Sequence, residues 1–249
     1  MTDVVAALAE ILRESRRAVI FTGAGMSTES GIPDFRSPGG IWTKMQPIEF
    51  KDYLSDPDAR RVSWQRRLEM EETWNTVTPN AGHRAVAEMI ARGKASHVIT
   101  QNIDGLHQQS GVPDERLVEL HGSTRYAKCL DCGTRVEIPD VLNHFTAHGD
   151  APDCALCGGL VKTATISFGQ PMPEDEMARA NAAVRACDLM LVLGSSLVVY
   201  PAAGFPELAK RNGAILAIVN REPTPLDQIA DLVIHSGIGD TLGGAAAVN

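Results

Sequence analysis

Short apolar runs, separated by polar segments with helical spacing, recur along this chain. Five of the runs are typical of buried strands, because they are rich in aliphatic residues and end at turn-forming residues. Strands that alternate with helices along a chain are typical of a parallel sheet covered on both faces. We therefore expect an α/β fold with a doubly wound parallel sheet. The predicted strands are Ala18–Thr22, His97–Thr100, Leu189–Gly194, Ile215–Asn220 and Leu232–Ile234.

Helical spacing describes much of the remaining chain. Between Val4 and Leu12 apolar residues recur every three or four positions, which predicts an amphipathic helix ending near Arg16. This is not the pattern of an export signal, and no apolar run approaches the ~20 residues that span a bilayer. We therefore expect a cytoplasmic protein with reduced thiols. Further helices are predicted over His83–Ala91, Pro173–Ala186 and Pro201–Lys210.

Two segments interrupt the alternation of strands and helices. Residues 37–76 are charged, helical in character and contain three tryptophans, whereas residues 125–161 contain four cysteines and few strong core positions. We interpret both segments as insertions that form a smaller lobe, which leaves residues 1–36, 77–124 and 162–249 for the large domain. A cleft between two such lobes is a common place for a ligand.

Composition and charge narrow the possible partners. A chain of 249 residues with 44% hydrophobic content can form one sizeable core. Its formal charge of −8 does not suit binding to nucleic acid by bulk electrostatics, which needs a basic surface. An acidic surface favours cationic partners such as lysine-rich peptides. We expect a monomer that binds neither nucleic acid nor membranes.

Four of the five cysteines form two pairs with the same spacing. Cys129 and Cys132, like Cys154 and Cys157, are separated by two residues, and 21 residues lie between the pairs. Two such pairs offer a tetrahedral set of thiolates, which suits zinc. Because four protein ligands leave no position for water, we predict a structural zinc site. The alternatives are a redox pair, unrelated cysteines or a contribution from the histidines between the pairs. Cys187 is expected in the core.

A glycine-rich segment follows the first predicted strand. Gly23 and Gly25 lie where the strand turns, and glycines allow backbone N–H groups to approach a phosphate closely. The third glycine of the dinucleotide-binding GxGxxG pattern is missing, because position 28 is Thr28. A loop broken by glycine and proline comes next, which suggests a cover over a ligand. It ends in an acid, an aromatic ring and a base, Asp34, Phe35 and Arg36.

Polar residues follow three other predicted strands at their carboxyl ends, where open α/β sheets bind ligands. Asn102 and Asp104 suit a ribose and a carboxamide, but capping of their own loop explains them equally well. His121 is a possible general base near neutral pH, although a structural role is the more common one for a single histidine. Weaker candidates for phosphate and ribose contacts follow the later strands, Gly194–Ser196 and Asn220–Glu222.

In combination, these motifs point to one family. The chain carries, in one order, GAGMSTESGIPDFR, TQNIDGLH, LHG, the two cysteine pairs, SFG, GSSLVVYP and IVN. This set resembles the sirtuins, which are NAD-dependent protein lysine deacylases. The resemblance covers roughly residues 15–240. It implies a Rossmann-like large domain, a smaller lobe with a zinc ribbon, and NAD bound between them.

The resemblance also implies roles for individual residues. His121 matches the catalytic base, and Asn102 is expected to assist it. Phe35 matches the residue that shields the reacting ribose carbon. The expected cofactor-binding residues are Gly23, Ala24, Gly25, Thr28, Asp34, Phe35, Arg36, Trp42, Gln101, Asn102, Ile103, Asp104, Gly194, Ser195, Ser196, Asn220, Arg221, Glu222 and Ile238.

Two further segments resemble those that clamp the substrate peptide as an added strand, Val161–Gly169 and Leu197–Tyr200. The expected contacts are Ile166, Phe168, Gly169, Val198 and Val199. The family often has Glu at the position of Gln170, so peptide preference is expected to differ. We find no Tyr-x-x-Arg pair of the dicarboxylic-acyl-selective members, which favours acetyl or longer neutral acyl groups.

The implied reaction transfers an acyl group from lysine to ADP-ribose and releases nicotinamide. The acyl oxygen must lie close to the ribose carbon with water kept away, after which His121 deprotonates a ribose hydroxyl. Three alternatives remain at this point: mono-ADP-ribosyl transfer to protein on the same fold, a non-catalytic NAD-binding module, and a hydride-transferring dehydrogenase.

Overall fold

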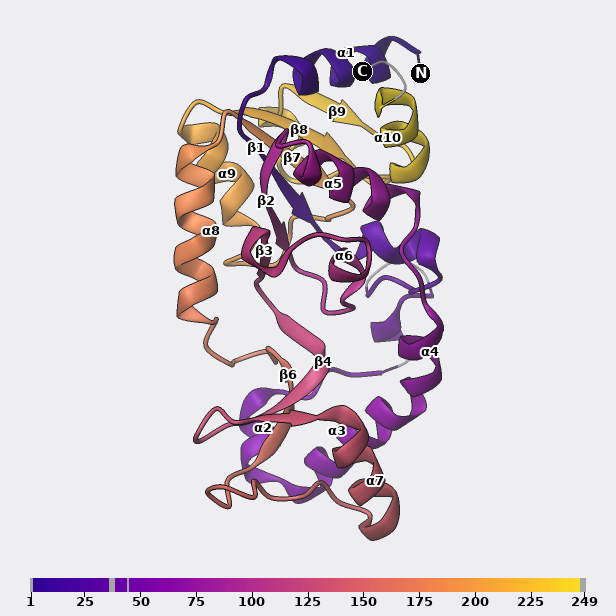
Figure 1. Cartoon of the computed structure of the whole chain (residues 1–249), viewed down its shortest axis with the longest axis vertical. Coiled ribbons are helices and arrows are strands. Elements are labelled where there is room, and N and C mark those ends of the chain that lie inside the picture. Colours follow the sequence, from indigo (N-terminus) through magenta and orange to yellow (C-terminus); the bar gives the residue numbers. More distant parts are fainter. Residues whose placement is uncertain (1, 36–38, 44, 247–249) are drawn as a thin grey trace.

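The computed structural model describes residues 2–35, 39–43 and 45–246. The molecule is elongated, with a large α/β part at one end and a smaller part at the other (Figure 1). A six-stranded parallel sheet forms the centre of the large part, and a three-stranded antiparallel sheet lies in the smaller part. None of the helices in the described residues is long and apolar enough to span a bilayer.

The parallel sheet has the strand order β3-β2-β1-β7-β8-β9. The chain therefore builds outward in one direction from β1 and in the other from β7, and the carboxyl ends of these two strands flank the point where the order reverses. Open α/β sheets bind ligands at such a point. The strands are β1 (Ala18–Thr22), β2 (Ala95–Thr100), β3 (Leu117–Glu119), β7 (Leu189–Leu193), β8 (Ile215–Val219) and β9 (Leu232–Ile234).

The predicted α/β class and the five predicted strands are confirmed, and β3 is an addition. Its three residues are too few to show a periodicity of their own. Predicted helix ends differ from the observed ones by a few residues. The helix expected from Pro201 begins at Gly204, because residues 201–203 form a turn instead.

Helices cover both faces of the parallel sheet. Ala18 and Ile20 of β1 point into one core, and Val19 and Phe21 point into the other, as the alternation of a strand requires. Both cores are apolar, which explains why β1 is apolar from Ala18 to Phe21. The first core is closed by α1 (Thr2–Glu14), α5 (Ala81–Ala91) and α10 (Ile238–Ala246), and the second by α8 (Glu174–Ala186) and α9 (Gly204–Arg211) (Figure 1).

The start of α5 is fixed by a capping box. The Asn80 side chain accepts a hydrogen bond of 3.1 Å from the His83 N–H, and the Asn80 N–H lies 3.4 Å from the His83 ring. The Asn80 amide also donates to the Met26 carbonyl over 2.8 Å. The capping residue thus ties α5 to the segment that follows β1.

Two buried histidines lie beneath the carboxyl ends of β1 and β2. The rings of His83 and His107 are 5.0 Å apart, and His107 Nε2 lies 3.0 Å from the Thr22 hydroxyl. His107, from α6 (Leu106–Gln109), is therefore a structural residue of the sheet edge. Burial lowers the pKa of His83 to about 4 and that of His107 to about 3. Both rings are neutral at physiological pH.

We expect this pair to make the fold sensitive to acid. Below pH 6.5 the unfolded chain protonates these histidines, whereas the folded protein does not until about pH 4 for His83 and about pH 3 for His107. Stability therefore rises with pH across this window, by about 1.4 kcal/mol per pH unit for each proton. Urea unfolding at pH 7 and pH 5 should show that the free energy of unfolding falls less between these pH values in His107→Gln than in the unchanged protein. An equal fall in both proteins would contradict this account. The control is His148→Gln, which removes an exposed histidine.

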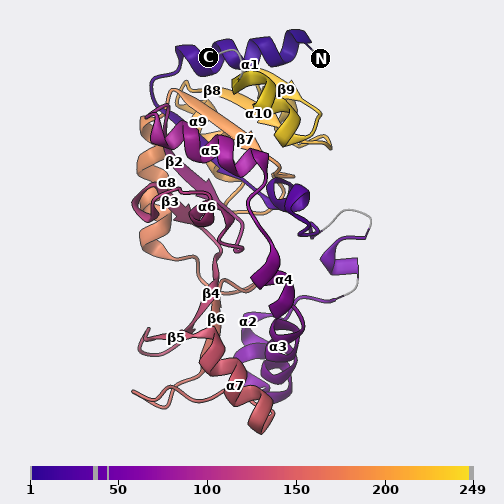
Figure 2. The same ribbon diagram turned by 45° about the vertical axis from the view of Figure 1, so that its right-hand side comes forward.

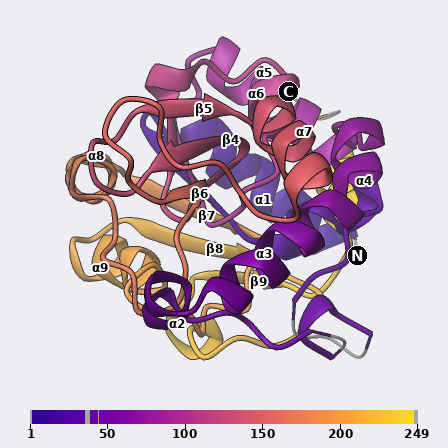
Figure 3. The ribbon, with the colours of Figure 1, turned by 90° about the horizontal axis from the view of Figure 1, so that it is seen from below.

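The smaller part combines two stretches of chain that lie far apart in sequence. Its sheet has the order β5-β4-β6, and its helices pack alongside (Figures 2 and 3). Trp64 from the first stretch and Phe145 from the second share a third core with Cys129 and Cys154. The elements are α2 (Phe50–Ser55), α3 (Pro57–Glu69), α4 (Glu71–Thr76), β4 (Gly122–Cys129), β5 (Arg135–Glu137), α7 (Ile138–His148) and β6 (Val161–Thr165).

A buried hydrogen-bond chain connects these two stretches. The Trp64 indole N–H donates to the Tyr53 hydroxyl over 3.0 Å, and that hydroxyl donates to the Val161 carbonyl over 2.7 Å. Burial raises the pKa of Tyr53 to about 12, so the hydroxyl keeps its proton. The helices of residues 50–69 are therefore fixed to β6, the strand that leads into the predicted substrate segment.

Candidate functional site

The glycine turn after β1 packs against the turn after β7. Gly25 N–H donates to the Gly194 carbonyl over 2.8 Å, and Gly23 N–H donates to the Leu193 carbonyl over 3.2 Å. A Cβ built on Gly25 would lie 2.9 Å from the Gly194 backbone. Glycine is therefore required here by close contact between two backbones, and the 3₁₀ turn Ala24–Ser30 can begin directly at the edge of the sheet.

Gly194→Ala is expected to destabilise the protein by on the order of 3 kcal/mol and to abolish NAD binding. Gly194 has φ +63°, and a Cβ there would lie 2.4 Å from the Met26 nitrogen. Gly204→Ala is the matched control, because the nearest atom to its Cβ is 4.0 Å away. Thermal unfolding and calorimetric titration with NAD measure both effects. Wild-type values for Gly194→Ala would contradict the requirement for glycine.

A pocket of about 220 Å³ opens beside the two glycine turns. It brings together eight predicted cofactor residues from α10 and from the segments that follow β1, β7 and β8. Glu29 and Ser236 also line it and escaped the sequence analysis, because an acid and a serine in a polar loop carry no pattern of their own. The predicted residues in the lining are Gly25, Thr28, Asp34, Gly194, Asn220, Arg221, Glu222 and Ile238.

A buried polar group lies at the ends of β1 and β2. The Asn102 side-chain amide donates to the Gly23 carbonyl over 3.0 Å, and the Ser27 hydroxyl donates to Asp104 over 2.7 Å. The other Asp104 oxygen accepts from the Leu106 N–H over 2.9 Å, so Asp104 also caps its own loop. Burial raises the pKa of Asp104, which these hydrogen bonds oppose. Asp104 can therefore cap its own loop with one oxygen and belong to the polar group with the other. Ser27 is a member that the sequence analysis missed.

The residues between these groups are also held in place. Gln101 donates from its side chain to the Ser195 hydroxyl over 2.7 Å, which connects the ends of β2 and β7. The Ile103 carbonyl accepts a hydrogen bond of 2.9 Å from the Thr124 N–H. Ser196 is exposed, whereas Ser195 is buried. Gln101 and Ser195 thus bridge the reversal point of the sheet. Ala24 is half-buried beside them.

His121 lies directly before β4 and is half-buried. Its Nδ1 is 3.1 Å from the Gln101 carbonyl. A carbonyl only accepts, so Nδ1 carries the proton and Nε2 keeps a lone pair that can accept one. The His121 carbonyl accepts from the Ile166 N–H over 2.8 Å, which places the histidine beside the predicted substrate segment.

Three aromatic rings connect the predicted cofactor loop with the predicted substrate segment. The ring centroids of Phe35 and Trp42 are 5.4 Å apart, and those of Trp42 and Phe168 are also 5.4 Å apart. Such tilted pairs have favourable aromatic geometry. They form an apolar wall suited to excluding water. Arg36 lies outside the described residues, so its predicted contact is not placed.

The predicted substrate segments present apolar side chains to solvent. Phe168 and Val198 are exposed, and Val199 is half-buried. The Phe168 carbonyl accepts from the Phe50 N–H over 2.8 Å, which ties this segment to α2, while Gly169 has φ +79°. Gln170 accepts from the Ser167 N–H over 3.1 Å and so closes its own turn. A glutamate there could accept the same bond, so Gln170 changes mainly the local charge.

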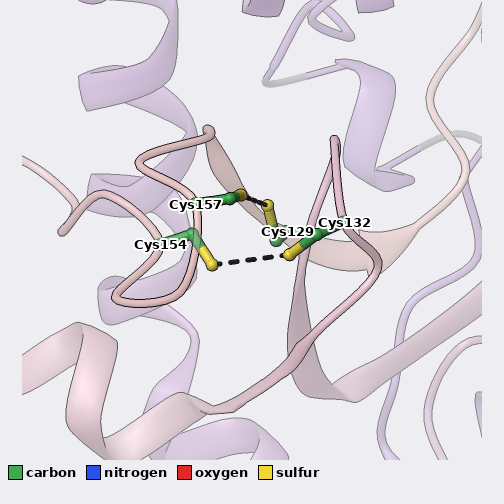
Figure 4. Close-up of side chains that lie close together, drawn as sticks. All are labelled: Cys129, Cys132, Cys154 and Cys157. Atoms are coloured by element: carbon green, nitrogen blue, oxygen red, sulfur yellow. Dashed lines mark hydrogen bonds between the residues drawn. The ribbon is translucent and has the colours of Figure 1, made fainter.

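The four paired cysteines converge in the smaller part (Figure 4). Their sulfur atoms all lie within 4.8 Å of one another, with Cys129 and Cys157 at 3.5 Å and Cys132 and Cys154 at 3.7 Å. A tetrahedral zinc with Zn–S bonds of about 2.3 Å gives sulfur–sulfur distances of about 3.8 Å. The cysteines therefore fit zinc, and the redox and unrelated-cysteine alternatives explain this geometry less well.

Each cysteine pair forms a tight turn that is followed by a glycine. Gly133 and Gly158 have φ +75° and +73°, and their N–H groups donate to the Cys129 and Cys154 carbonyls. Cys187 lies apart from the cluster, half-buried against the second core. Burial raises its pKa to about 11. It packs at the edge of the second core, less deeply than the sequence predicts.

Comparison with known proteins agrees with this geometry. A model of the Sir2 family matches residues 23–201. A NAD-dependent protein deacetylase of Bradyrhizobium diazoefficiens is 57% identical over 236 residues, 95% of this chain and 92% of that protein. A NAD-dependent protein deacylase of Archaeoglobus fulgidus is 42% identical over 97% of this chain and 94% of its own length.

The fold agrees as well. A solved structure of Sir2 with a p53 peptide and NAD+ superposes with a TM-score of 0.87 at 34% identity, covering 97% of both chains. The glycine turns, the polar group at the ends of β1 and β2, and the four-cysteine cluster thus occur in a chain with both the sequence and the fold of one family. This protein belongs to the Sir2 family.

Proposed function

We propose that this protein is a NAD-dependent protein lysine deacylase, which transfers an acyl group from lysine to ADP-ribose and releases nicotinamide. One observation carries this conclusion. The Gln101 carbonyl accepts the His121 Nδ1–H, which makes Nε2 the basic nitrogen of the ring, and the same Gln101 belongs to the polar strand end that includes Asn102 and Asp104. A pure NAD sensor has no need of a general base. A dehydrogenase has no need of a peptide clamp.

Different residues of the chain carry out different parts of the reaction. Bound NAD supplies an activated nicotinamide–ribose bond and the hydroxyls that receive the acyl group. Asn102 and Asp104 orient the ribose and the carboxamide, and the wall of Phe35, Trp42 and Phe168 keeps water away. Nε2 of His121 accepts the proton from a ribose hydroxyl as that oxygen attacks the acyl carbon.

We assign residues 1–36, 77–124 and 162–249 to the NAD-binding domain, and residues 37–76 and 125–161 to the small domain. The third core, which both inserted segments share, supports this division. The zinc held by the four cysteines stabilises the small domain. It takes no part in the reaction, because all four of its positions are filled by thiolates.

The substrates we propose are acyl-lysine peptides, added as a strand between Ile166–Gly169 and Val198–Val199. The exposed Phe168 and Val198 offer apolar contacts for the lysine stem. The net charge of −8 favours peptides with flanking basic residues and disfavours nucleic acid. We place the protein in the cytoplasm as a monomer, in the class of transferases.

The proposal is tested by a panel of peptides carrying acetyl, propionyl, butyryl and succinyl lysine. Nicotinamide release and the mass of the peptide are followed with NAD labelled in the ADP-ribose. We expect neutral acyl groups to be removed, with the label in O-acyl-ADP-ribose, and succinyl lysine to react at least about tenfold more slowly. Label on protein would indicate mono-ADP-ribosyl transfer instead. Binding of NAD without nicotinamide release would indicate a non-catalytic module.

A further inference from the structure

A carboxylate is built into the pocket at the end of β8. Glu29 Oε1 accepts a hydrogen bond of 3.3 Å from the Gly239 N–H in the first turn of α10. The same oxygen lies 3.8 Å from the Arg221 guanidinium. A Cβ added to Gly239 would come within 2.5 Å of the other Glu29 oxygen, so the carboxylate lies against the backbone. Glu29 therefore occupies a position suited to an anion, between a helix N-terminus and an arginine.

The rest of the pocket is also acidic. Glu29, Asp34 and Glu222 line it, with Arg221 as the one cation in the described lining. Arg221 is already neutralised locally by Glu29. At the β8 end, Glu29 and Glu222 thus offer two carboxylates against the one guanidinium of Arg221. A further anion placed here meets net negative charge, and the described lining offers it no uncommitted cation.

The position of the pocket indicates which part of a dinucleotide enters it. One end is formed by the glycine turns at Gly25 and Gly194, to which the proposed function assigns the phosphates, and the other by Asn220, Arg221 and Glu222. With the pyrophosphate at the first end, the adjoining ribose directs its hydroxyls toward the end of β8. A 2′-hydroxyl can donate to a carboxylate, but a 2′-phosphate can only accept, and it carries negative charge.

We propose that Glu29 is a specificity-determining residue that admits NAD and excludes NADP. The proposal rests on the proposed function, because it assumes that the adenosine end of NAD lies in this pocket. The Glu29 carboxylate repels the 2′-phosphate, and it occupies the two groups, Arg221 and the N-terminus of α10, that would otherwise bind that phosphate.

Calorimetric titration of the full chain with NAD and with NADP, without peptide, tests this inference apart from activity. We expect NADP to bind roughly 100-fold more weakly than NAD. Glu29→Gln keeps an oxygen for the Gly239 N–H but removes the charge, and should strengthen NADP binding about tenfold with little change for NAD. Adding Arg221→Ala to Glu29→Gln should remove that gain in NADP affinity. The gain comes from the Arg221 guanidinium, which no longer pairs with a carboxylate at position 29.

The controls separate this inference from the proposed function. Glu176→Gln removes a glutamate paired with Arg179 on α8, away from the pocket, and should leave both affinities unchanged. Glu222→Gln removes a second carboxylate of the lining and should also strengthen NADP binding. This variant keeps the inference testable if Glu29→Gln does not fold. Equal binding of NAD and NADP, or an unchanged ratio in Glu29→Gln and Glu222→Gln, would overturn the inference and leave the deacylase intact. Absence of NAD binding to the unchanged chain would overturn both.

Discussion

Replacing His121 by alanine is expected to lower kcat/KM for acyl-lysine removal by roughly 10²- to 10⁴-fold, the range typical of a general base. The imidazole is held by a hydrogen bond from Nδ1 to the Gln101 carbonyl, which leaves Nε2 to accept the proton. Alanine leaves no group at this place that can accept a proton. Peptide mass and nicotinamide release, measured separately, show which step is lost.

The effect on the fold should be small by comparison. His121 is half-buried and precedes β4, so its truncation opens no deep cavity. NAD affinity, zinc content and thermal stability should stay close to those of the unchanged protein. His144→Ala on α7 is the matched control and should retain full activity, because His144 lies in the smaller part away from the glycine turns. Retained activity in His121→Ala would refute the assignment of the base.

Replacing Cys129 or Cys154 by serine is expected to release zinc and to unfold the smaller part. Both side chains are buried in the third core and also supply ligand sulfurs, so the substitution removes a metal ligand and disrupts packing together. Structural zinc in small domains contributes about 10–16 kcal/mol of apparent binding free energy, which the core of this part cannot replace. Metal analysis and near-UV circular dichroism should report both losses.

Cys187→Ser provides the comparison for the zinc ligands. It removes a half-buried thiol from the large part and should leave the zinc content at one per chain, with a modest drop in melting temperature. A chelator should reproduce the effect of Cys129→Ser in the unchanged protein. A folded, active Cys129→Ser variant without metal would show that zinc is dispensable.

The sequence was sufficient for features that depend on residue type at short range. The strand Ala18–Thr22 is apolar up to Phe21 because both faces of the sheet are covered, and within each cysteine pair a local turn brings the two residues together. Asn220 and Gly194, both chosen because they follow apolar strands, line one pocket in the structure. These predictions rest on the rule that parallel strands end at one edge of the sheet.

Other features depend on contacts that no local pattern encodes. The strand pairing of β4, β5 and β6 was not predicted, because β5 has only three residues and β6 only five. Ser27 became a site residue only through its contact with Asp104, 77 positions away. Glu29 is similar, since its partners Arg221 and Gly239 lie near the other end of the chain.

The arrangement of the smaller part limits how it can be engineered or lost. It is assembled from two stretches, so the chain passes between the two parts four times, before α2, after α4, along β4 and along β6 (Figure 1). No single cut therefore releases it as a module, and no single insertion could have delivered it in its present form. Four covalent tethers also prevent the parts from separating. Any movement of one part relative to the other must be a rotation about those crossings.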